Sequence, residues 1–143
     1  MNIASVAGLI AAIVSLVILA LQNSLFATGN VAIAIQVLAV FLMIWARLTF
    51  GRRSFHAAAN PTEGGLVTTG PYKYLRHPIY AAAIYFCWAG VLTHFSLLHS
   101  LLGLLAIAGL SVRMLAEERL VTERYPDYAD YAARTKRVVP FVF

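Results

Sequence analysis

The chain has 143 residues, of which 61% are hydrophobic and only 12% charged, and it carries a net charge of +5. With a mean hydropathy of +0.77, this composition excludes an ordinary soluble globular domain and indicates one membrane-embedded unit. The single cysteine, Cys87, lies in an apolar run, so neither an intrachain disulfide nor a thiol-based metal or redox pair is expected.

Four apolar segments meet, or nearly meet, the length of about 20 residues that a bilayer-spanning helix needs. They are residues 3–21, 31–48, 79–95 and 100–116. The first has no basic residues before its apolar run and no clear cleavage site after it, so we expect a permanent span rather than a signal peptide. The third and fourth are short and close together, which predicts a tight helical hairpin.

Small residues in the last two segments predict close packing between these two helices. Glycine and alanine allow helix backbones to approach in lipid, where no hydrophobic effect drives helices together. The residues concerned are Ala81, Ala82, Ala83 and Gly90 in the third segment and Gly103, Ala106 and Gly109 in the fourth.

The positive charges predict the topology. All eleven Lys and Arg residues fall within 47–76 or 113–137, and the connections 22–30 and 93–100 contain none. By the positive-inside rule, the central loop, the C-terminal tail and both termini are expected in the cytoplasm. The basic residues lie near helix ends and form no separate domain, so they indicate contact with anionic membrane lipids and not with nucleic acid. The Asn-Pro-Thr-Glu-Gly-Gly run at 60–65 marks an extramembrane loop.

The stretch GPYKYLRHPIY at 70–80 places polar groups directly before the third apolar segment. Its Gly-Pro pair indicates a turn, and Pro78 suits the first turn of a helix, so the third helix is expected to begin at Pro78 or Ile79. Arg76 and His77 would then lie at a helix N-terminus, which favours an anion such as a carboxylate. The alternative is that Arg76 only sets topology and that an interfacial aromatic belt is formed by Tyr72, Tyr74 and Tyr80.

A second polar cluster lies where the fourth segment ends, at 113–125. Arg113 and Glu117 are four residues apart and can pair, whereas Glu118 points about 100° away round the helix. Two adjacent acids at a membrane helix exit are costly unless they meet water or a cation. A solvated helix end with mixed charges is the alternative. The following tail, 125–143, alternates aromatic and charged residues and predicts a short amphipathic helix on the cytoplasmic membrane face.

The 70–80 stretch, together with EERLVTERYPDYADYAARTKRVVP, resembles the C-terminal half of the isoprenylcysteine carboxyl methyltransferase and phospholipid methyltransferase family of integral membrane enzymes. The resemblance covers about residues 68–140. It implies a catalytic region in 51–143 with S-adenosylmethionine bound at the cytoplasmic face, whereas the two N-terminal transmembrane helices in 1–50 are expected from hydropathy alone. The implied cofactor-binding residues are Tyr74, Leu75, His77, Pro78, Tyr80, Glu117, Glu118, Tyr128 and Tyr131.

The acceptor is less determined by the sequence. A carboxylate needs only an arginine to hold it, a role that the resemblance offers to Arg76 and Arg137, whereas an amine needs a base, for which Glu118 and His77 are candidates. We favour the carboxylate of a lipid or isoprenoid-like small molecule. No metal is expected, and the oligomeric state stays open. The small size suggests a prokaryotic cytoplasmic membrane. An NADPH-dependent membrane reductase and a non-enzymatic membrane scaffold are the alternative functions.

Overall fold

The computed structural model describes residues 3–51 and 65–142, which form five α-helices, one short 3-10 helix and an isolated parallel β-bridge between Leu75 and Lys136. The helices are α1 (Ile3–Leu21), α2 (Asn30–Phe50), η2 (Gly70–Lys73), α3 (Pro78–Thr93), α4 (Leu97–Arg124) and α5 (Tyr128–Arg134). The all-α prediction is confirmed for these residues. The loop predicted at 60–65 lies outside them, apart from Gly65.

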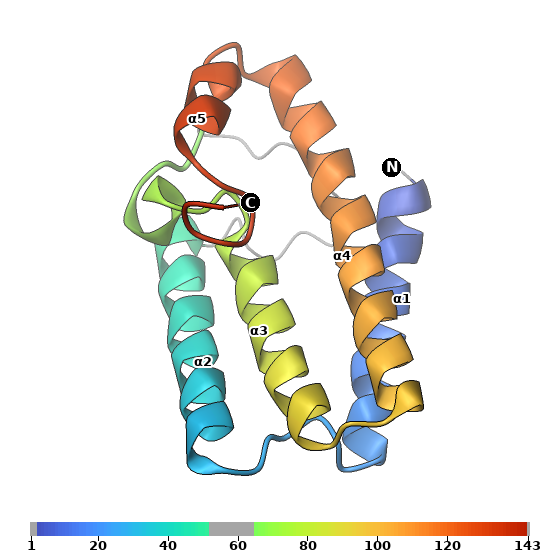
Figure 1. Ribbon diagram of the computed structural model, residues 1–143. Helices are drawn as coiled ribbons and strands as arrows, with labels where there is room; N and C mark the ends of the chain where they lie inside the picture. Colours follow the sequence, from blue (N-terminus) through green and yellow to red (C-terminus); the bar gives the residue numbers. More distant parts are fainter. Residues whose placement is uncertain (1–2, 52–64, 143) are drawn as a thin grey trace.

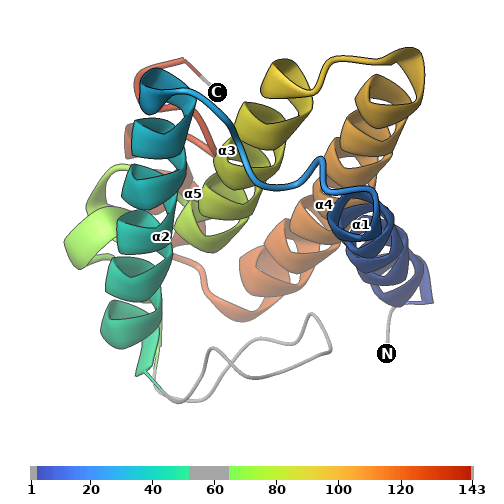
Figure 2. The ribbon, with the colours of Figure 1, turned by 90° about the horizontal axis from the view of Figure 1, so that it is seen from below.

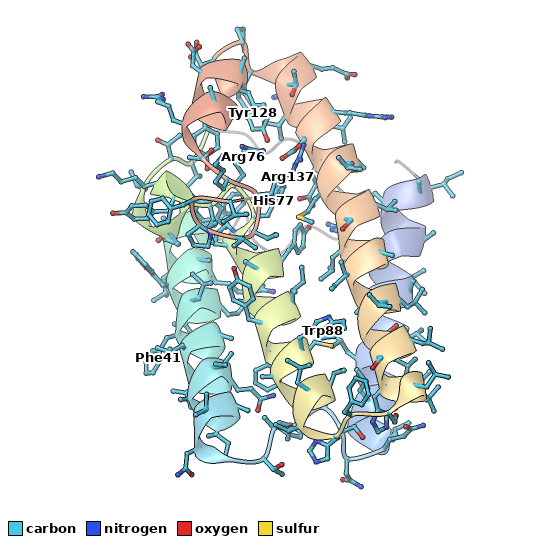
Figure 3. All side chains as sticks on the ribbon, in the orientation of Figure 1. Phe41, Arg76, His77, Trp88, Tyr128 and Arg137 are labelled. Carbon is cyan, nitrogen blue, oxygen red and sulfur yellow. The ribbon has the colours of Figure 1, made fainter. Side chains whose placement is uncertain are left out.

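Three of the described helices, α1, α2 and α4, are long and apolar enough to cross a membrane. Phe41 illustrates the lipid-compatible outer surface, since its ring projects away from the bundle on α2 (Figure 3). By contrast, α3 has 16 residues. At a rise of about 1.5 Å per residue it is about 24 Å long, which is shorter than a hydrocarbon core of about 30 Å. The fourth span therefore stays a prediction.

The four long helices are arranged as two pairs, with α1 beside α4 and α2 beside α3 (Figures 1 and 2). Each N-terminal helix thus packs on a helix from the second half of the chain. The domain boundary expected after residue 50 therefore separates helices that pack on one another. Two apolar clusters join the pairs, one around Leu19, Val91 and Leu102 and the other around Leu75, Ala81 and Met114.

Helix α1 contacts α4 through a narrow stripe of mostly small side chains. The buried residues of α1 recur at intervals of three and four, which places them on one face: Ser5, Gly8, Ala12, Ser15 and Leu19. The backbones come closest where Gly8 meets Gly109, because a Cβ added at Gly8 would lie 2.5 Å from the Gly109 carbonyl oxygen. Gly109 therefore faces α1, and its predicted packing against α3 is wrong.

The predicted hairpin is confirmed as a tight connection but not as a closely packed helix pair. Only His94, Phe95 and Ser96 separate α3 from α4, and the Ser96 side chain caps α4 by accepting a hydrogen bond from the backbone N–H of His99 at 3.1 Å. Beyond the contact between Trp88 and Gly103, the two helices diverge (Figure 1). Gly90 does not face α4, because an added Cβ would collide with the backbone of the loop after α1, at Ser24 and Leu25.

Replacing Gly109 by leucine is expected to destabilise the protein by about 1–3 kcal/mol or more, because overpacking forces backbone shifts. Here the added side chain would collide with the backbone of α1. The matched variant is Gly103→Leu, whose Cβ would meet only the Trp88 side chain, at 3.2 Å. A side chain moves more easily than a helix backbone, so Gly103→Leu should cost less. Thermal unfolding of both variants in detergent measures the difference, and equal stability would contradict the Gly8–Gly109 contact.

Candidate active site

Three segments that are far apart in the sequence meet at one end of the bundle: the loop before α3, the last turns of α4, and the segment around α5. The backbone holds the first and third together. The N–H of Arg76 donates to the Lys136 carbonyl at 2.7 Å, and the N–H of His77 donates to the Arg137 carbonyl at 3.0 Å. Figure 3 shows Arg76, His77, Tyr128 and Arg137 gathered there, facing α4.

Local sequence explains how the loop presents its side chains. Gly70 has a φ of +58°, a conformation that glycine adopts readily, and its missing Cβ leaves room for Thr49 of α2. Pro78 begins α3 with His77 as the N-cap, as predicted. His77 and Arg76 therefore emerge at the start of a helix, beside the C-terminal segment.

The carboxylate of Glu118 is the centre of the cluster. Its Oε1 accepts a hydrogen bond from Nε of Arg76 at 3.0 Å, and its Oε2 accepts from Nη2 of Arg137 at 3.0 Å and Nε of Arg137 at 3.1 Å. His77 Nε2 lies 3.3 Å from Oε1. The Glu118 side chain is only 13% exposed. A buried charge is tolerated when it is paired and hydrogen-bonded, and both oxygens of Glu118 satisfy that condition.

The two arginines around Glu118 differ in how firmly they are held. Nη1 of Arg76 also donates to the carbonyl oxygens of Ala132 at 2.8 Å and Thr135 at 2.6 Å, and its side chain is 11% exposed. Arg137 is 31% exposed, and its hydrogen bonds to Glu118 raise the pKa of its guanidinium above the usual value. Arg76 thus joins the loop, α4 and the C-terminal segment, whereas Arg137 lies at the more open edge of the cluster.

Glu117 occupies a second, adjacent set of contacts. Its Oε1 accepts a hydrogen bond from the Tyr80 hydroxyl at 2.6 Å and lies 3.2 Å from Nε of Arg113. Its Oε2 lies 3.8 Å from Nδ1 of His77. The predicted pairing of Arg113 with Glu117 is confirmed, and Glu118 points to different partners, as its helical position requires.

Two tyrosines of α5 cover the cluster. Burial raises the pKa of the Tyr131 phenol to about 12, and the Tyr131 hydroxyl donates to the Tyr72 carbonyl at 2.7 Å. Burial, with a smaller contribution from the Glu118 carboxylate, also raises the pKa of Tyr128. Both phenols are therefore neutral in the physiological pH range. They offer aromatic surface and a hydroxyl group, and no charge.

Most of the predicted site residues converge, but two have other surroundings. Tyr74 is 51% exposed, and its ring lies 5.8 Å from Nζ of Lys73. Leu75 packs in the apolar cluster with Ala81 and Met114. Residues brought around the two glutamates are Arg76, His77, Tyr80, Tyr128 and Arg137.

Two residues near Glu117 were missing from the predicted site. The sequence predicts Arg113 only as a partner of Glu117, whereas its Nε also donates to the Tyr80 hydroxyl at 2.6 Å. Ser5 of α1 lies 3.5 Å from Nη1 of Arg113. The spacing of small residues along α1 was the available signal for Ser5, because it marks the face that meets α4.

Comparison with known proteins identifies the family of this chain. Residues 24–128, well over half of the chain, match the phospholipid methyltransferase family. The chain belongs to this family. Membership of this methyltransferase family, together with three apolar helices of membrane-spanning length, makes the chain an integral membrane protein.

A curated relative adds a more distant likeness. The chain is 28% identical over 137 residues to the nickel-cobalt-cadmium resistance protein NccN of Alcaligenes xylosoxydans xylosoxydans. The match covers 93% of this chain and 63% of the relative. No solved structure matches the chain. The family match begins after α1 and ends at Tyr128, so α1 and most of the C-terminal segment lie outside it.

Proposed function

We propose that this member of the phospholipid methyltransferase family is an S-adenosylmethionine-dependent enzyme that methylates a membrane-associated acceptor. The observation that carries the proposal is the meeting of the 70–80 loop, the glutamate pair and the C-terminal segment around Glu118. These are the segments on which the resemblance to membrane methyltransferases rests. They are separated in the sequence, and the fold brings them to one end of the bundle.

The residues present suit the cofactor's chemistry. S-adenosylmethionine carries a carboxylate, an ammonium, a sulfonium and an adenine, so its site needs a cation, an anion and aromatic or apolar walls. Arginines, glutamates and the rings of Tyr128 and Tyr131 supply these groups. When bound, S-adenosylmethionine supplies a methyl carbon already activated by the sulfonium. The protein's part is then mainly to orient the reactants and to exclude water.

We assign different roles to the two glutamates on the basis of their contacts. Both oxygens of Glu118 are engaged by Arg76 and Arg137, so we assign it the role of organising the cluster. Glu117 has Oε1 held by Tyr80 while Oε2 is turned toward His77. We therefore propose that Glu117 binds the ammonium of the cofactor. The carboxylate of the cofactor would be bound by His77 and the first turn of α3.

The charges favour an anionic acceptor. Among these five side chains, the guanidiniums of Arg76, Arg113 and Arg137 outnumber the carboxylates of Glu117 and Glu118 by one positive charge. Arg137 is the more exposed guanidinium at Glu118, so we assign it the acceptor carboxylate, with Arg76 holding the segment that carries it. The carboxylate would belong to a lipid or isoprenoid-like molecule. A phospholipid amine is the second candidate, with His77 as the base, because the arginines engage both oxygens of Glu118.

Cofactor binding tests the proposal against its alternatives. Purified protein in detergent should bind S-adenosylmethionine and S-adenosylhomocysteine and should not bind NADPH, as measured by isothermal titration calorimetry. Binding of NADPH alone would favour a membrane reductase, and binding of neither would favour a scaffold. The NccN relative is named for resistance to nickel, cobalt and cadmium. Within residues 3–51 and 65–142, no three His, Cys, Asp or Glu side chains gather as metal ligands, so our proposal stays with methyl transfer.

The proposal includes four spans with the site facing the cytoplasm, which can be tested with impermeant thiol reagents. Ala129→Cys, in the exposed part of α5, should react only after the cytoplasmic side is opened, whereas Phe95→Cys, between α3 and α4, should react in intact cells. The reason is that the basic residues lie at the α5 end of the bundle. The background is Cys87→Ala, which removes the one native thiol. Labelling of both positions from one side would contradict a crossing by α4.

A further inference from the structure

A buried arginine lies below the candidate active site, between α1 and α3. The Arg113 side chain is 5% exposed and is attached to α4. It reaches three groups: the Tyr80 hydroxyl of α3 at 2.6 Å from Nε, Glu117 Oε1 at 3.2 Å from Nε, and the Ser5 hydroxyl of α1 at 3.5 Å from Nη1. A charge in such a place is costly unless it is paired, and side chains of this kind in membrane helices usually have a function.

Two hydrogen bonds run in series from Arg113 through Tyr80 to Glu117. Arg113 donates to the Tyr80 oxygen, and the Tyr80 hydroxyl then donates to Glu117 Oε1 at 2.6 Å. Successive bonds of this kind polarise and strengthen one another where the dielectric is low. The Tyr80 ring also stacks on His77, with the ring centroids 5.6 Å apart and the planes at 19°. One link therefore restrains Glu117 Oε1 and the orientation of His77 at the same time.

We propose that Arg113 is a positioning residue: with Tyr80, it holds Oε1 of Glu117 so that Oε2 is presented toward His77 for the ammonium of the cofactor. This inference rests on the proposed function. It extends the site to α1 through the contact between Ser5 and Arg113. The segment that matches the family begins at residue 24, after α1.

The test is a double-mutant cycle on S-adenosylmethionine binding. Arg113→Met is expected to weaken binding by at least about tenfold, because Glu117 loses the group that fixes it. In a Glu117→Gln background, which keeps an oxygen acceptor, the same Arg113→Met change should weaken binding little further. A purely structural role for Arg113 would give the same loss in both backgrounds, and that result would overturn the proposal.

Two further variants keep the test decisive. Tyr80→Phe keeps the ring on His77 and removes the hydroxyl that joins Arg113 to Glu117, so it should show the same dependence on Glu117 even if Arg113→Met fails to fold. Gly90→Ala disturbs the contact of α3 with the loop after α1, at the end of the bundle away from Arg113. It should lower thermal stability while leaving cofactor affinity within about twofold of wild type. An affinity loss in Gly90→Ala as large as in Arg113→Met would also overturn the proposal.

The wild-type titration separates this inference from the proposed function. If wild-type protein does not bind S-adenosylmethionine, the proposed function fails and this inference fails with it. If wild-type protein binds and Arg113→Met and Tyr80→Phe bind equally well, the inference alone is wrong.

Discussion

Glu118→Ala is expected to cost more stability than any other single truncation in the candidate active site. The substitution leaves Arg76 and Arg137 without the carboxylate that they share, and His77 without its neighbour at 3.3 Å. Removing one partner of a buried ion pair typically costs about 3–5 kcal/mol, because the remaining charge is left unpaired. Cofactor affinity should fall as well, since the C-terminal segment that carries Arg137 would no longer be held on α4.

Thermal unfolding in detergent and titration with S-adenosylmethionine measure these two effects. Limited proteolysis after α4 reports separately on release of the C-terminal segment. The control is Glu123→Ala, an exposed acid on the same helix, which should change stability by no more than about 0.5 kcal/mol. Equal behaviour of the two alanine variants would show that Glu118 does not organise the site.

Arg76→Ala and Arg137→Ala are expected to separate structure from turnover. Arg76 donates to the carbonyls of Ala132 and Thr135 as well as to Glu118, so its loss should destabilise the C-terminal segment and lower cofactor affinity. Arg137 is more exposed, so its loss should cost less stability. If Arg137 holds the acceptor, its loss should lower methyl transfer by about 10- to 150-fold, the range for one charge-assisted hydrogen bond of about 1.5–3 kcal/mol.

Membranes that contain each variant, supplied with tritiated S-adenosylmethionine, allow methyl transfer to endogenous lipids to be measured before the acceptor is identified. Calorimetry on the same variants gives cofactor affinity. The assignment is reversed if Arg76→Ala keeps cofactor affinity and loses transfer while Arg137→Ala does the opposite. Arg76 would then be the residue that contacts the acceptor.

Hydropathy predicted the helices well and their partners poorly. The start of α3 at Pro78 and the short connection to α4 follow from proline chemistry and from the brief polar interval, which are local features. The pairing of α1 with α4 does not follow from hydropathy, because every face of an apolar helix can contact lipid. The pairing depends on which small residues face each other. Gly8 and Gly109 are 101 positions apart in the sequence, so no local pattern links them.

The site was predictable in composition and only partly in arrangement. Arg113 and Glu117 lie on one helix, so their spacing alone predicts the pair. Arg76 and Arg137 reach Glu118 across sequence separations of 42 and 19 residues, and only the fold brings those together. Tyr74 and Tyr128 look alike in the sequence, yet one is half exposed and the other is buried beside Glu118.

The bridge between Leu75 and Lys136 has a consequence for biosynthesis. Chains are made from the N-terminus, so α1, α2, α3 and α4 are all synthesised before the segment that carries Lys136. Until residues 136 and 137 have been synthesised, Glu118 lacks Arg137, and the loop that carries Arg76 and His77 lacks its backbone partners. The candidate active site is therefore the last part of the described chain to assemble, and a chain truncated before Lys136 should lack it.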